Sequence, residues 1–64
     1  MENTMSGYEV EVTLSNGSTH VISSNHGEEE FEHQMNRAEP GDVVVLWRVD
    51  EWGNRTHVRE SYGN

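Results

Sequence analysis

The sequence predicts an α+β fold in the order strand, strand, helix, strand, strand, with a mostly antiparallel sheet of four strands and one helix on one face. Three observations predict it. Apolar and polar residues alternate at period two from Tyr8 to Leu14, the pattern of a strand buried on one face. Val43 to Trp47 is a continuous apolar run, as expected of a strand covered on both faces. Between them lies a glutamate-rich segment with apolar residues at helical spacing.

The first two strands are expected to form a tight hairpin. The dipeptide Asn16-Gly17 supplies the two positive φ angles that a two-residue type I′ turn requires. Thr19 to Ser23 then returns as the second strand. This turn would align Val12 with Val21, because loop length sets the pairing register. Val21 is therefore predicted on the inner face of the sheet and Ile22 on the outer face.

The helix is predicted to begin after Asn25, which can cap it, with Glu28 closing a capping box. It should run to about Ala38, since residues beyond that point are turn formers. Phe31, Met35 and Ala38 fall at helical spacing and form an apolar stripe that faces the sheet.

The third and fourth strands should follow a type II turn at Glu39-Pro40-Gly41-Asp42. Gly53-Asn54 is a candidate two-residue turn between them, and it would place Arg48 opposite Arg59. The residues of the third strand predicted to face the helix are Val45, Trp47 and Val49. The residues predicted to face outward are Val44, Leu46, Arg48 and Asp50.

The strand order 2-1-3-4 is favoured because it brings the outward Glu9 and Glu11 within reach of Arg48. The order 1-2-3-4, with the third strand parallel to the second, is the alternative, and a small five-stranded barrel is a further one. The polar residues 1–7 are expected to form a disordered tail. Residues 8–62 then make a single small domain, the size for which dimerisation commonly enlarges the core.

Composition narrows the class of protein. The 64 residues include no cysteine, which excludes a disulfide framework and a thiolate metal site and suits a cytoplasmic protein. No segment is long and apolar enough for a membrane span. Twelve acidic residues stand against four arginines and no lysine, for a net charge of −8. Such a charge repels phosphate backbones and makes nucleic-acid binding a secondary hypothesis.

One helical face carries two histidines and two glutamates, namely His26, Glu29, Glu30 and His33. Histidine and carboxylate at this spacing can converge on zinc, and His26, Glu30 and His33 are the weak candidates. This face lies opposite Phe31, however, so we expect it to be solvated, with neither a metal nor a cofactor.

A second set of side chains is basic and is predicted to point outward from the last two strands: Arg48, Arg55, His57 and Arg59. Their charge could be balanced internally by Glu9 and Glu11, or externally by a carboxylate, a phosphate or an acidic partner. Trp52 in the turn between these strands is a candidate exposed aromatic anchor.

A third set is the acidic surface of the helix, formed by Glu28, Glu29, Glu30 and Glu32. Acidic residues in a first turn compensate the helix dipole and keep a protein soluble. The alternative is that they imitate the charges of a nucleic acid and bind a basic partner.

Catalysis finds no support in the sequence, which lacks a nucleophile motif and a glycine-rich phosphate loop. We therefore expect a non-catalytic protein–protein interaction domain, either self-associating as a homodimer or serving as an accessory subunit. Its contact surface would combine the Trp52 hairpin with the outer sheet face, where Ile22, Val44 and Leu46 are predicted to be exposed.

Overall fold

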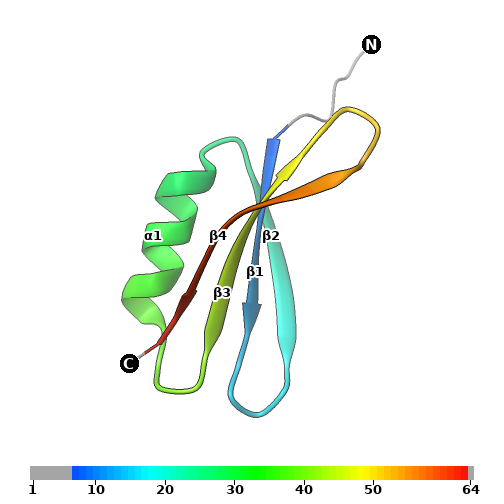
Figure 1. Ribbon diagram of the computed structural model, residues 1–64. Helices are drawn as coiled ribbons and strands as arrows, with labels where there is room; N and C mark the ends of the chain where they lie inside the picture. Colours follow the sequence, from blue (N-terminus) through cyan, green and yellow to red (C-terminus); the bar gives the residue numbers. More distant parts are fainter. Residues whose placement is uncertain (1–6, 64) are drawn as a thin grey trace.

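Four antiparallel strands form one open sheet in the order β2-β1-β3-β4, with a single helix packed on one face (Figure 1). The computed structural model describes residues 7–63. Its elements are β1 (Gly7–Thr13), β2 (Thr19–Ser24), α1 (Gly27–Arg37), β3 (Val43–Val49) and β4 (Arg55–Tyr62). The predicted fold class and strand order are confirmed, and the order 1-2-3-4 is wrong. Gly7, predicted in the tail, is the first residue of β1, and the rest of that predicted tail lies outside the described residues.

The β1–β2 loop is one residue longer than predicted. Leu14 N–H donates to the Ser18 carbonyl at 2.7 Å, and Gly17, with φ of 95°, donates to the Leu14 carbonyl at 2.8 Å. These bonds enclose three loop residues, the second common type of hairpin connection. A shift of one residue exchanges the two faces of a strand. The predicted faces of β2 are therefore wrong: Ile22 lies on the helix side, and Val21 points outward and is 50% exposed.

The β3–β4 hairpin has the same kind of loop. Asp50 N–H donates to the Asn54 carbonyl at 3.0 Å and so closes the loop, and Gly53 has φ of 85°. Val49 consequently pairs with Arg55, and Arg48 pairs with Thr56 rather than with Arg59. The predicted two-residue turn at Gly53-Asn54 is wrong for the same reason as in the first hairpin, because Gly53 ends a three-residue loop.

The faces of β3 are also the reverse of the prediction. Val44 and Leu46 pair with Val12 and Val10, and all four are at most 5% exposed beneath the helix. An apolar run has no alternation of apolar and polar residues, so the run itself does not show which of its side chains face the helix. The side chains of β3 that point away from the helix are Val43, Val45, Trp47 and Val49.

The core lies between α1 and the two central strands. Its buried members are Val10, Val12, Phe31, Val44 and Leu46, with Tyr8, Leu14, Met35 and Ala38 packed against them. The predicted helical stripe of Phe31, Met35 and Ala38 is confirmed.

The start of the helix is set by close packing rather than by a side-chain cap. The N-cap is His26, without a side-chain hydrogen bond to the helix, so the predicted Asn25 cap is wrong. Gly27 is buried, and a Cβ atom built there would lie 2.3 Å from the ring of Tyr8. The absence of a side chain at Gly27 thus lets the first turn sit directly on β1.

Asp42 joins three segments that are distant in the sequence. Its carboxylate is 7% exposed and accepts hydrogen bonds from Ser15 N–H at 3.1 Å and Glu39 N–H at 2.9 Å, while its carbonyl accepts from Gly63 N–H at 2.8 Å. Gly41 has φ of 94°, and Asp42 N–H donates to the Glu39 carbonyl at 3.0 Å. These features confirm the predicted type II turn.

Candidate functional site

The sheet face opposite α1, which we call the outer face, receives side chains from all four strands. In the described part of the chain, no helix or loop packs across it, because α1 contacts the other face. Glu9 and Glu11 lie on this face, as predicted. Its apolar members are Val21, Val43, Val45, Trp47 and Val49.

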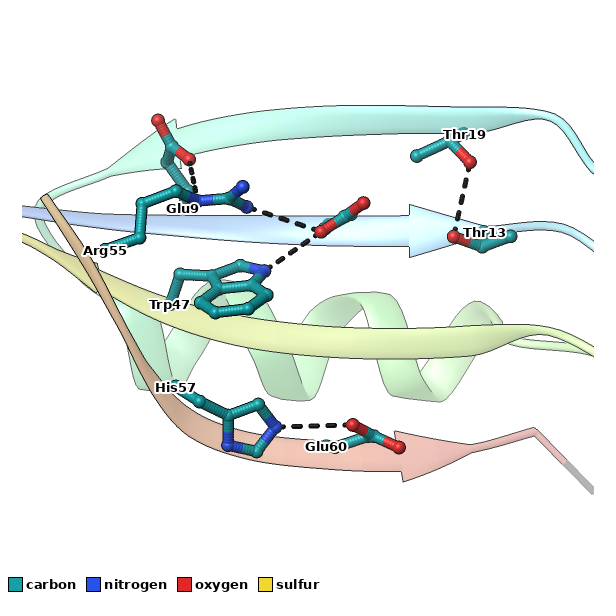
Figure 2. Close-up of polar contacts among 8 residues, drawn as sticks. Glu9, Thr13, Thr19, Trp47, Arg55, His57 and Glu60 are labelled. Carbon is teal, nitrogen blue, oxygen red and sulfur yellow. Dashed lines mark hydrogen bonds and ion pairs between the residues drawn. The ribbon is translucent and has the colours of Figure 1, made fainter. Parts of the chain in front are cut away.

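Arg55 links β4 to β1 across the outer face. Its Nε lies 3.1 Å from Glu9 Oε1, and its Nη2 lies 3.3 Å from Glu11 Oε1. Its guanidinium carbon is also 4.3 Å from the centroid of the Trp47 ring, within the range of a cation–π contact. Figure 2 shows these side chains together on the sheet, with the helix behind it. Arg55 is therefore held by two carboxylates and an aromatic ring at once.

Trp47 is fixed in one orientation by its neighbours. Its Nε1–H donates to Glu11 Oε1 at 2.9 Å, and the His57 ring meets it edge to face, with centroids 5.5 Å apart and an interplanar angle of 86°. A buried or half-buried indole usually finds such a polar partner for its N–H. The outer face thus presents a rigid aromatic side chain near its centre.

Glu60 continues this set of contacts to the other end of β4. His57 Nε2 lies 3.3 Å from Glu60 Oε1, and the Tyr62 hydroxyl donates to Glu60 Oε2. The Tyr62 hydroxyl, and secondarily His57, lowers the pKa of Glu60 below its usual value. The same hydrogen bond raises the pKa of Tyr62, because the hydroxyl loses a carboxylate acceptor when it ionises.

The predicted basic cluster is divided between the two faces of the sheet. Arg55 and His57 lie on the outer face, whereas Arg48 pairs with Tyr8 and Arg59 pairs with Leu46 on the helix side. The predicted pairing of Arg48 with Arg59 is therefore wrong. The glutamates of β1 do neutralise an arginine, but it is Arg55 rather than Arg48.

Arg59 instead connects β4 to the acidic helix. Its Nη1 lies 2.6 Å from Glu28 Oε1 and 3.6 Å from Glu32 Oε2. Glu30 accepts a hydrogen bond from Gln34 Nε2 at 2.7 Å. Three of the four glutamates of the predicted acidic surface therefore have partners within the fold, and Glu29 remains exposed.

The weak metal candidates line an open hollow at the start of the helix. It is bordered by Ser24, His26, Glu29, Glu30 and His33. Among residues 7–63, no three histidine, aspartate or glutamate side chains converge closely enough to hold a metal ion.

Trp52 lies in the β3–β4 loop and is 77% exposed. The loop around it is well ordered by Asp50, whose Oδ1 accepts from Asn54 N–H at 2.8 Å and from Trp52 N–H at 2.9 Å. Both hydrogen bonds lower the pKa of Asp50, and the bond from Asn54 N–H has the larger effect. A fixed backbone therefore presents a free indole to solvent.

The apolar residues predicted on the outer face are placed differently. Ile22, Val44 and Leu46 lie on the helix side, with Val44 and Leu46 fully buried, so they cannot form a contact surface. The sequence reading missed Val45 and Trp47. The alternating glutamates of β1 carried the missing signal, because each residue paired with Glu9 or Glu11 must share their face.

Comparison of the chain with protein-family models, with curated proteins and with solved structures gives no match. Within residues 7–63, α1 is the sole helix, and it lacks the length and apolarity needed to cross a membrane.

Proposed function

We propose that this chain is a small, non-catalytic protein–protein interaction domain that serves as an accessory subunit in the cytoplasm. Its contact surface is the outer face together with the Trp52 hairpin. The observation that carries the proposal is the set of apolar side chains on a sheet face that no described element covers. Val21 is exposed and Val43, Val45, Trp47 and Val49 are half-buried, and apolar side chains gathered on a face in contact with solvent are typical of an interaction site.

Two tryptophans give the surface its anchors. Trp47 is held rigidly by Glu11, Arg55 and His57, so little side-chain entropy is lost when a partner covers it. Trp52 stands free at the tip of the hairpin. Tryptophan and arginine are enriched among the residues that dominate binding energies.

The charge of the surface indicates what kind of partner fits. Glu9, Glu11 and Glu60 outnumber Arg55 on the outer face, and the whole chain has a net charge of −8. Complementary charge accelerates and orients association. The partner expected is a protein with an apolar contact region bordered by lysine and arginine.

The internal ion pairs weaken the anion-binding alternative. Arg55 and Arg59 already contact carboxylates of the fold, so an external phosphate would have to displace them. The acidic helix is likewise partly neutralised by Arg59. Neither arrangement supports nucleic-acid binding or nucleic-acid mimicry as well as the outer face supports protein binding.

Site-specific photocrosslinking in cells that produce the protein tests the proposal. A benzophenone amino acid at Val45 or Trp52 should give one discrete crosslinked protein. The matched control places the same group at Glu29, which is exposed on the helix. Crosslinking from all three positions alike, or from none of them, would contradict an interaction surface on the outer face.

A further inference from the structure

We propose that a second copy of this chain pairs with the free edge of β2, in an antiparallel arrangement about a two-fold axis at Val21. The two sheets would then form one continuous sheet of eight strands. This interface lies at an edge of the sheet, so the inference does not depend on the proposed function of the outer face.

The opposite edge of the sheet is blocked by features that prevent such pairing. In β4, Val58 is an extra residue between the pairs Leu46–Arg59 and Trp47–His57, which makes a β-bulge. This strand also carries three charged side chains, Arg55, Arg59 and Glu60. Bulges and charges are the usual means by which edge strands avoid pairing with other chains.

The β2 edge has none of these features. The strand Thr19–Ser24 contains no proline and no formally charged residue when His20 is neutral, and its ladder with β1 is regular over six consecutive pairs. The helix does not shield it, because α1 packs mainly on β1 and β3. In Figure 1, β2 forms the outer edge of the sheet. An uncharged, regular edge strand is a template for another strand.

The hydrogen bonds of the hairpin show which backbone groups are free. Leu14 donates to Ser18, so these two form a hydrogen-bonded pair, and such pairs alternate along an antiparallel ladder. The backbone groups of His20 and Ile22 therefore point towards β1. Those of Thr19, Val21 and Ser23 point away from the sheet, towards solvent.

These free groups match those of a second copy. With Val21 opposite Val21 of the second copy, Thr19 falls opposite Ser23, and all three sets of N–H and carbonyl groups can pair. The side chains of these residues lie on the outer face of both copies. The exposed valines then contact each other and the hydroxyls lie side by side, as stabilising cross-strand pairs do.

The absence of cysteine allows a direct crosslinking test. Directly opposite residues in such a pair have Cα atoms about 5.5 Å apart, within the range that a disulfide spans. The variant Val21→Cys should therefore form a disulfide-linked dimer under mild oxidation. The controls are Val58→Cys on the other edge and Val45→Cys at the centre of the outer face, and both should remain monomeric.

Sedimentation of the unmodified chain, from about 10 µM to about 1 mM, tests the same interface without a crosslink. Val21→Pro removes an N–H that β1 does not use, so circular dichroism should show a retained fold while the dimer dissociates at least about tenfold more readily. A chain that stays monomeric over this range would overturn the inference. A dimer that is linked by Val45→Cys rather than by Val21→Cys would overturn it as well.

The two proposals fail separately. A dimer of the unmodified chain in sedimentation, together with a discrete photocrosslink from Trp52, would support both. A monomeric chain that still gives the photocrosslink would overturn only the edge pairing, and a dimer without that photocrosslink would overturn only the proposed function.

Discussion

Arg59, on the edge strand β4, lies over the ring of Phe31 in the helix, with its guanidinium carbon 4.6 Å from the ring centroid. Phe31 is the largest fully buried side chain. The same guanidinium pairs with Glu28. One side chain therefore covers the core and ties β4 to α1, elements that otherwise have few contacts.

Replacing Arg59 by alanine should lower the free energy of unfolding by about 1–2 kcal/mol, through loss of the cation–π contact, the half-exposed ion pairs and the packed stem. Urea denaturation followed by fluorescence measures it. Arg48→Ala is the control, since Arg48 has no ion pair with the described residues, and its effect should stay within about 0.5 kcal/mol. Equal effects of the two substitutions would show that Arg59 has no special role.

Asp42→Ala should be among the most damaging substitutions of a polar residue. It removes the acceptor of two part-buried hydrogen bonds, from Ser15 N–H and from Glu39 N–H. Their loss costs about 1–3 kcal/mol, since each hydrogen bond contributes about 0.5–1.5 kcal/mol net, a large share of the stability of so small a domain. Thermal unfolding followed by circular dichroism measures the loss, with the exposed Glu51→Ala as control. A melting temperature equal to that of the control would refute the role assigned to Asp42.

Gly27→Ala is expected to destabilise the protein even though alanine favours helices by about 1 kcal/mol over glycine. The added Cβ would overlap the Tyr8 ring, and overpacking of this kind costs about 1–3 kcal/mol. A double-mutant cycle with Tyr8→Ala measures the clash, because the alanine at position 27 should then be neutral or stabilising. Additive effects of the two substitutions would argue against the contact.

The hydrogen bond between Glu60 and Tyr62 should contribute to stability at intermediate pH and be lost towards both ends of the pH scale. The pKa of Glu60 is lowered from 4.5, so its contribution is present above pH 4.5 and is lost as the pH falls through the folded value. The pKa of Tyr62 is raised from 10.0, so its contribution is present below pH 10.0 and is lost as the pH rises through the folded value.

Tyr62→Phe should therefore bring the pKa of Glu60 back towards 4.5, as measured by carboxylate chemical shifts during an acid titration. Glu60→Gln should bring the pKa of Tyr62 back towards 10.0, as measured by phenolate absorbance. His57→Ala is the comparison for Glu60, because its imidazole contributes less to the shift than the Tyr62 hydroxyl does. If neither substitution moved the other residue's pKa, this hydrogen bond would not exist in solution.

The sequence predicted the helical stripe and the type II turn before β3, because each depends on a local pattern. It predicted the strand order from a contact of Glu9 and Glu11 with Arg48, but the arginine that they contact is Arg55. It failed on the faces of β2 and β3. Asn16-Gly17 is compatible with a two-residue and a three-residue loop, and the two differ by one step of register. The apolar run of β3 gave no alternation to correct the error. The pairing of β3 with the alternating residues of β1, such as Glu11 with Val45, shows which side chains of β3 face away from the helix.

The reversed faces of the predicted strands also explain why only part of the candidate site was predicted. Trp52 and Arg55 were placed correctly because a tip and an end of a hairpin are exposed in either register. Arg48 and Arg59 were misplaced because their faces depend on register alone. Trp47, at the centre of the outer face, was taken as core because the predicted alternation of β3 placed it on the helix side together with Val45 and Val49.

The central position of β1 has a consequence for how the chain folds during synthesis. This strand, Gly7–Thr13, is paired on one side by β2, which follows it immediately, and on the other by β3, which begins at Val43. A lone hairpin is at best marginally stable in water. The segment that lacks β3 leaves one edge of β1 unpaired, so the sheet and the helix are expected to become stable together only when β3 is free to pair with β1.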